Sequence, residues 1–250
     1  MKWLIQPVKV EKEKMEELMD MLEKADIPFD IVYPIKGEIL TPEKTPYIFN
    51  DKETYFVCGS YPLTRYVHKI RPEAVFSLEN YSFDNLMEIF GKENFVNYDA
   101  KVLDSKDLIW NEEEYFIRPL NDDKAFNGGI YNSNTFQYEG DIVVAKLKSI
   151  SQEHRFFVIN GEIITGSRYK VAGSFSSSPI IDDGALSFAK KMIEKFKEPG
   201  FVIDIATINN EYKIMELNCF NASGFYDINL YKYIVAVENY YHEVVVKNHF

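Results

Sequence analysis

Hydrophobic positions in the first part of the chain form two short apolar runs that flank an amphipathic segment. The runs are residues 3–8 and 29–34, and between them apolar side chains recur at helical spacing over residues 11–25. A further apolar run follows at residues 54–58. Strand, helix and strand in this order predict a parallel unit with a right-handed crossover.

The pattern changes after residue 114 to short apolar segments separated by turns, which is typical of antiparallel hairpins. Residues 154–159 and 162–168 flank Asn160-Gly161, a strong type I′ turn signal. We interpret the polar stretch 174–183 as a loop, and the periodicity of residues 184–196 predicts a helix. Helices and antiparallel strands together indicate an α+β fold.

One hairpin, residues 201–218, carries acidic residues inside apolar strands. Asp204 lies in the first strand and Glu216 in the second, and Asn218 projects from the same face as Glu216. Carboxylates are rarely buried without a partner, because their desolvation is costly. A hard divalent cation suits two carboxylates and an amide. The alternative is a surface hairpin whose acidic side chains point into water.

The register of this hairpin decides whether the two carboxylates can share an ion. A three-residue loop over residues 209–211 would pair Ile208 with Tyr212 and place Asp204 opposite Glu216, with Cβ atoms roughly 5 Å apart. A two-residue Asn209-Asn210 turn would shift the register by one and separate the carboxylates onto opposite faces. A metal site therefore requires an odd-numbered loop or a β-bulge.

Cationic residues and a glycine-rich loop precede the hairpin in an order that suits phosphate chemistry. Arg118 lies just before Gly128-Gly129, Arg155 lies on a predicted strand, and Arg168 ends its hairpin partner, with Lys170 two residues later. Phosphoryl transfer needs cations, backbone N–H groups over the phosphates and a metal. The alternative is that the arginines pair with surface acids and the glycines only form turns. The ordered set favours a site.

Composition restricts the partners of the chain. Its 250 residues include 28 basic and 39 acidic ones, a formal net charge of −11, which argues against binding a long nucleic acid. No apolar run approaches the roughly 20 residues that span a bilayer. The N-terminus becomes charged too early for a signal peptide. Cys58 and Cys219 match no metal-binding spacing and suggest reduced thiols in a cytoplasmic protein.

From Tyr115 to Tyr226 the chain resembles the ATP-grasp fold. The matching segments are YFIRP, NDDKAFNGG, EHRFFVINGEIITGSRYK, FVIDIA and MELNCFNASGFY. The resemblance is closest to a bacterial and phage branch of ATP-grasp that is named for two arginines and one lysine. It implies an ATP-grasp domain over residues 104–250, preceded by a small α/β domain over residues 1–103.

The resemblance also implies how the site would hold Mg-ATP. Asp204, Glu216 and Asn218 match magnesium ligands, with Glu216 bridging two ions. Arg118 stands where many ATP-grasp enzymes have a phosphate-binding lysine, and it keeps the charge in a planar fork.

Further positions match the nucleotide pocket of the family. The flexible loop from Lys124 to Gly128 and Gly129 would cover the β- and γ-phosphates. Ala145, Lys146 and Leu147 match the hinge that accepts adenine. Arg168 matches a cation that steadies the reacting phosphate, and Arg155 and Lys170 resemble further phosphate or substrate contacts.

The function implied is an ATP-dependent carboxylate–amine ligase that forms an amide or peptide bond through an acyl phosphate. Its partners would be a small-molecule or peptide carboxylate and an amine, and the Ser223-Gly224 loop would lie beside the acyl phosphate or the acceptor. Two alternatives are a phosphotransferase on the same fold and a non-catalytic module that binds a nucleotide or a protein. The carboxylate could belong to a peptide, a protein tail, a free amino acid or a modified base.

Overall fold

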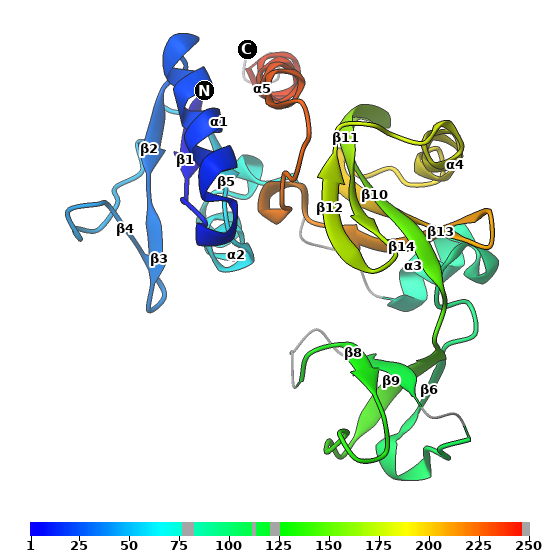
Figure 1. The fold of residues 1–250 in the computed structure, drawn as a ribbon. Helices are drawn as coiled ribbons and strands as arrows, with labels where there is room; N and C mark the ends of the chain where they lie inside the picture. Colours follow the sequence, from blue (N-terminus) through cyan, green and yellow to red (C-terminus); the bar gives the residue numbers. More distant parts are fainter. Residues whose placement is uncertain (77–82, 112–113, 121–125, 247–250) are drawn as a thin grey trace.

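The computed structural model describes residues 1–76, 83–111, 114–120 and 126–246 (Figure 1). Lys124, one of the expected nucleotide contacts, lies outside these ranges. The described chain contains a small N-terminal sheet, a four-stranded sheet and a five-stranded sheet, together with a short two-stranded hairpin. Mixed helices and antiparallel strands confirm the predicted α+β class.

The N-terminal sheet confirms the predicted parallel unit. Its strand order is β2-β1-β5, and β1 pairs in parallel with both neighbours. The strands are β1 (Lys2–Ile5), β2 (Phe29–Ile31) and β5 (Tyr55–Cys58), and the helices are α1 (Lys12–Lys24) and α2 (Tyr61–Ile70). Between β2 and β5 the chain forms a small hairpin of β3 (Tyr33–Ile35) and β4 (Glu38–Leu40).

The four-stranded sheet is antiparallel, with the order β6-β9-β7-β8. Its strands are β6 (Lys101–Asp104), β7 (Tyr115–Pro119), β8 (Gly129–Tyr131) and β9 (Asp141–Lys146). In Figure 1 this sheet lies apart from the N-terminal sheet. The expected boundary between residues 103 and 104 falls within β6, which pairs with β9.

The five-stranded antiparallel sheet carries the expected metal-binding residues and the cations Arg155, Arg168 and Lys170. Its order is β12-β11-β10-β13-β14. The strands are β10 (Ile150–Ile159), β11 (Glu162–Val171), β12 (Ser174–Ser178), β13 (Gly200–Ile208) and β14 (Glu211–Asn218). The prediction of a loop over residues 174–183 is wrong at its start, because β12 forms there. Its serine-rich sequence gives no apolar alternation, and pairing with β11 supplies the strand structure.

Two hydrophobic cores cover the two faces of this sheet. Phe156 and Ile203 pack on one face with α3 (Phe83–Phe90) and α4 (Asp183–Ile193). Phe157 and Val202 pack on the other face in a core shared with α1 and α5 (Leu230–Tyr240). Figure 1 shows α5 beside α1, so the C-terminal helix joins the N-terminal unit to the five-stranded sheet.

The remaining helical segments are short. The 3-10 turns cover residues 9–11, 72–74, 92–94, 105–107 and 220–222, and a π-helical segment at 241–246 continues α5. Within the described residues, no helix combines the length and apolar character needed to span a membrane.

Candidate nucleotide and metal site

The turn between β13 and β14 contains two residues, an even number that by itself would not bring the two carboxylates onto one face. Ile208 pairs with Glu211, so the loop contains only Asn209 and Asn210. Both asparagines have positive φ, 50° and 64°, as a type I′ turn requires. Of the two alternatives the hairpin thus has the two-residue turn, and a regular hairpin with this turn would separate the carboxylates.

A register shift further along the hairpin restores the pairing. Ile205 pairs with Ile214, whereas the next residue on β13, Asp204, pairs with Glu216. Met215 is the extra residue, and it forms a β-bulge on β14. Of the two predicted ways to bring the carboxylates together, an odd-numbered loop or a β-bulge, the structure has the bulge. Asp204 and Glu216 therefore share one face.

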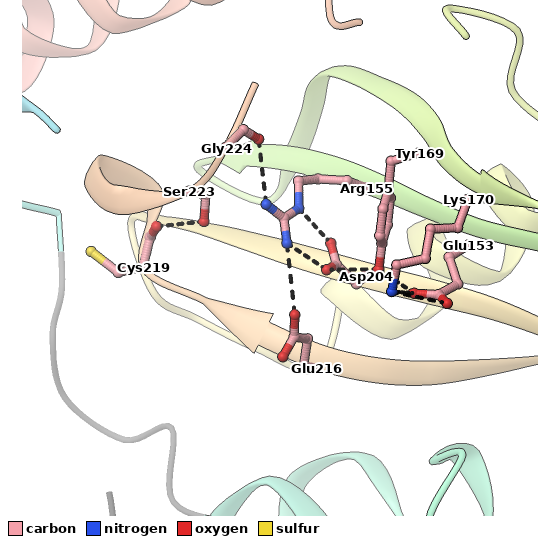
Figure 2. Close-up of polar contacts among 9 residues, drawn as sticks. All are labelled: Glu153, Arg155, Tyr169, Lys170, Asp204, Glu216, Cys219, Ser223 and Gly224. Atoms are coloured by element: carbon pink, nitrogen blue, oxygen red, sulfur yellow. Dashed lines mark hydrogen bonds and ion pairs between the residues drawn. The ribbon is translucent and has the colours of Figure 1, made fainter. Parts of the chain in front are cut away.

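Arg155 on the neighbouring strand β10 also faces Asp204. Its Nε donates to Asp204 Oδ1 at 2.8 Å and its Nη2 donates to Oδ2 at 2.6 Å (Figure 2). Asp204 is fully buried and Arg155 is 6% exposed. Burial opposes the charge on the guanidinium, but the Asp204 carboxylate outweighs burial and raises the pKa of Arg155. The pair is a bidentate, desolvated ion pair.

Glu216 and Asn218 form the open side of this face. The Glu216 side chain is 54% exposed, and its Oε1 lies 3.7 Å from Arg155 Nη2. Desolvation and then the charge of Asp204 raise the pKa of Glu216 to about 7. Asn218 lies two residues along β14 on the same face, and its buried Nδ2 has no hydrogen-bond partner among the described residues.

A second buried polar residue on β10 is Glu153, two residues before Arg155. Tyr169 on β11 donates its hydroxyl proton to Glu153 Oε2 at 2.6 Å, and Lys170 Nζ lies 3.2 Å from the same oxygen. A register shift between Arg168 and Lys170 on β11 brings Lys170 opposite Glu153. Burial, followed by the charges of Asp204 and Glu153, raises the pKa of Tyr169. Lys170 therefore lies next to the Arg155–Asp204 pair, as Figure 2 shows.

The loop after β14 closes over Arg155 on its other side. Arg155 Nη1 donates to the Gly224 carbonyl at 3.3 Å, and its guanidinium carbon lies 4.9 Å from the centre of the Tyr226 ring. Tyr226 stacks on Tyr169 with ring centres 4.7 Å apart. Tyr226 also has a positive φ of 51°, a strained backbone for a bulky residue. The arginine is therefore enclosed by two aromatic rings and a carboxylate.

Glu11 reaches this loop from the N-terminal unit. Burial raises the pKa of its carboxyl group, while the backbone N–H groups of Tyr226 and Phe225 and the charge of Arg155 act in the opposite direction. We did not predict roles for Glu11, Tyr169 or Tyr226. The only sequence signal was the position of Tyr169 between Arg168 and Lys170.

A cavity of about 830 Å³ adjoins the enclosed arginine. It lies between the start of α1, the turn between β5 and α2, strand β12 and the loop 221–227. Glu11, Gly224 and Tyr226 line it, and all three interact with Arg155. The Ser223-Gly224 loop thus separates the carboxylate face from a space large enough for a substrate.

Arg168 lies away from this arrangement. The register pairs Arg168 with His154 and pairs Arg155 with Ser167. Because side chains alternate along a strand, Arg168 leaves the sheet on the face opposite Arg155. Burial is the main cause that lowers the pKa of His154, and the charge of Arg168 lowers it further. The role of Arg168 in steadying the reacting phosphate stays a prediction.

Four expected nucleotide contacts, Arg118, Gly129, Ala145 and Lys146, lie in the four-stranded sheet, with Gly128 directly before β8 and Leu147 directly after β9. Arg118 on β7 donates to its neighbour's carbonyl at Pro119, and Gly128 packs so closely that an added Cβ would lie 3.1 Å from Arg118 Cβ. Ala145 on β9 is buried, and its neighbour Lys146 is exposed. The adjoining Leu147 is 40% exposed, and Gly129 opens β8.

The hinge segment is fixed by one ion pair. Lys148 Nζ lies 2.7 Å from Asp99 Oδ2 and donates to the Lys146 carbonyl at 3.0 Å. The Lys146 N–H donates to the same aspartate oxygen at 3.4 Å. These contacts hold the segment between the two sheets, where the adenine contact was expected.

The four-stranded and the five-stranded antiparallel sheets lie within the part of the chain that matches a known family. Residues 81–237, more than half of the chain, match the model described as ATP-grasp domain, R2K clade family 3. The chain belongs to this ATP-grasp family. No curated protein matches the chain.

Solved structures with the ATP-grasp fold are similar over most of the chain. A RimK domain ATP-grasp protein from Sphaerobacter thermophilus gives a TM-score of 0.57 at 12% identity, covering 88% of this chain and 90% of that one. A D-alanine–D-alanine ligase from Bacillus anthracis, complexed with ATP, gives 0.53 at 14% identity, covering 95% and 91%. The ATP-grasp ligase PsnB, complexed with a minimal precursor, gives 0.55 at 10% identity, covering 90% and 91%. These similarities establish the fold.

Proposed function

We propose that the protein is an ATP-dependent carboxylate–amine ligase. The observation that carries this proposal is the bulge at Met215, which puts Asp204 and Glu216 on one face with Arg155 in a member of an ATP-grasp family. β-Bulges are over-represented next to active sites, where they redirect a side chain. The similar structures named as ligases support the same reaction class.

The polar face suits magnesium. No cluster of three or more His, Cys, Asp or Glu side chains that could hold a metal occurs in the described part of the chain. Two carboxylates and the Asn218 amide nevertheless supply the hard oxygen ligands that Mg²⁺ prefers. The raised pKa of Glu216 also fits a face that is completed by a cation. In this proposal Asp204, Glu216 and Asn218 hold one or two Mg²⁺ ions, which would neutralise phosphate charge.

The nucleotide would lie between the four-stranded and the five-stranded sheets. Arg118 and the loop that ends at Gly128 and Gly129 would contact its phosphates, together with Lys124. The hinge residues Ala145, Lys146 and Leu147 would contact adenine. Lys170 would add positive charge near the phosphates, whereas the position of Arg168 on the opposite face of the sheet does not support a phosphate contact for it.

The reaction needs two balanced steps. A carboxylate oxygen of the substrate attacks the γ-phosphorus of ATP, the bond to the β,γ-bridging oxygen breaks and ADP leaves. An amine nitrogen then attacks the carbon of the acyl phosphate, the carbon–oxygen bond breaks, and phosphate and a proton are released. In this proposal Arg155, which Asp204 fixes and Tyr226 flanks, would stabilise negative charge during both steps.

Mass spectrometry of products tests this function. The protein would be incubated with Mg-ATP and a pool of amino acids and short peptides, and we expect ADP, phosphate and a new amide in equal amounts. The Glu216→Gln variant should lose the products, whereas Glu211→Gln, at the exposed start of β14, should retain them. A phosphorylated substrate without an amide would indicate a phosphotransferase and contradict the ligase proposal.

A further inference from the structure

The cavity beside Arg155 has the dimensions of a substrate site. Its volume of about 830 Å³ lies in the upper part of the range of roughly 300–1,000 Å³ that holds drug-sized ligands. Gly224 and Tyr226 belong both to its lining and to the contacts of Arg155. A molecule in the cavity would therefore reach the carboxylate face past a single loop.

One wall of the cavity is the edge strand β12. The sheet order places β12 at the end, and the described residues contain no strand that pairs with its outer side. Edge strands expose unpaired N–H and C=O groups that can pair with another chain. Phe175 and Ser177, two residues apart on β12, both line the cavity. Because side chains two residues apart share a face, the cavity lies over the face of the sheet next to this edge, and an extended chain that adds to β12 would run along the rim of the cavity.

Two side chains of β12 on this wall, Phe175 and Ser177, are incompletely packed or hydrogen-bonded within the described residues. Phe175 is 69% exposed, and its ring centre lies 5.7 Å from that of Tyr226 at the aromatic stack. The Ser177 Oγ is buried and has no hydrogen-bond partner among the described residues, so it is not itself a ligand contact. An exposed phenylalanine that lines a cavity suits a ligand with apolar groups.

We propose that this cavity binds the substrate as an extended polypeptide segment that pairs with β12. Backbone pairing along an edge strand gives affinity, and pockets for alternate side chains give selectivity. Phe175 would contact one substrate side chain, and the reacting end of the segment would lie near Gly224 and Arg155. The substrate is then a peptide or a protein segment and not a free amino acid.

This inference rests on the proposed ligase function, so the experiment measures both separately. Calorimetry with a non-hydrolysable ATP analogue and Mg²⁺ tests nucleotide binding. ADP release is then compared for a random-sequence tetrapeptide pool and for a pool of free amino acids at equal molar concentration. We expect peptides to give at least about tenfold faster release, and backbone N-methylation of the peptides to abolish the advantage because it removes strand donors.

Two variants locate the effect at β12. Phe175→Ala should raise the half-saturating peptide concentration about tenfold and leave nucleotide binding unchanged. Ile180→Ala is the matched control, because Ile180 is 73% exposed and lies outside the cavity lining. Equal or better use of free amino acids, no response to either pool while the nucleotide still binds, or equal effects of the two variants would overturn the inference. Failure to bind the nucleotide would instead contradict the proposed function.

Discussion

Arg155 donates one hydrogen bond to each carboxylate oxygen of Asp204, at 2.8 and 2.6 Å, across two neighbouring strands of the five-stranded sheet. Both side chains are almost completely removed from solvent. Because both charges are buried, each needs the other: removing one partner would leave the other charge desolvated without an opposite charge beside it. The guanidinium is thereby held in one orientation beside Glu216 and Gly224.

The first prediction follows from the burial of this pair. Asp204→Ala should lower the free energy of unfolding by about 3–5 kcal/mol, because it leaves the Arg155 charge buried and unpaired. Urea denaturation measures the change. Lys24→Ala is the control, because it removes an exposed helical ion pair with Asp20 and should cost no more than about 0.5 kcal/mol. Similar losses of unfolding free energy in both variants would show that the buried pair contributes no more to stability than an exposed one.

The second prediction concerns the pH dependence of metal binding. A protonated carboxyl group cannot ligate Mg²⁺, and the pKa of Glu216 is raised to about 7. Affinity for Mg²⁺ in the presence of an ATP analogue should therefore rise from about pH 5.5 to about pH 7 and then level off, by at most about tenfold per pH unit. Calorimetry at several pH values measures this dependence. The Glu216→Gln variant should bind Mg²⁺ more weakly, and its Mg²⁺ affinity should depend much less on pH. An unchanged pH dependence in this variant would assign the titration to another group.

The third prediction concerns the junction between the N-terminal unit and the five-stranded sheet. Buried Asn221 donates to the Val57 carbonyl at 2.8 Å and accepts from the Phe76 N–H at 3.0 Å. Asn221→Ala leaves both backbone groups without these bonds and should cost about 2–4 kcal/mol of unfolding free energy. Asn85→Ala, on the exposed surface of α3, should be close to neutral. A scan in urea compares the two variants, and equal midpoints would contradict a structural role of Asn221.

The sequence was informative wherever periodicity or turn chemistry determines structure. The parallel unit at the N-terminus and the Asn160-Gly161 hairpin follow from local patterns, and both form as predicted. The strand β12 was missed because its serines carry no apolar alternation, so only pairing with β11 reveals it. Hydrophobic periodicity and turn residues were therefore sufficient to predict those elements whose own sequences contain such patterns.

The candidate site depends more on contacts between distant segments. Glu11 and Tyr226 are far apart in the sequence and meet only because the N-terminal unit packs against the loop after β14. The position of Arg168 depends on a register that nothing near it in the sequence specifies. The hairpin posed a clear choice between an odd loop and a bulge, but the sequence does not say which strand residue becomes the bulge.

The last prediction tests that bulge directly by two deletions in β14. Without Met215 the register is regular, and Asp204 still pairs with Glu216, so the polar face should survive at a cost of about 1–2 kcal/mol. Deletion of Lys213 also removes one residue, but it moves Ile214 from its buried position onto the opposite face.

The Lys213 deletion puts Met215 into the core position of Ile214, and this repacking should cost about 1–3 kcal/mol in addition to the loss of the bulge. Urea denaturation and calorimetric Mg-ATP binding compare the two variants. Both deletions leave Asp204 opposite Glu216, so each variant should bind Mg-ATP where it is folded. Equal destabilisation by both deletions would mean that the bulge itself stabilises the hairpin. Because both variants keep the two-residue turn and the pairing of the carboxylates, the comparison separates the loss of the bulge from the repacking of β14.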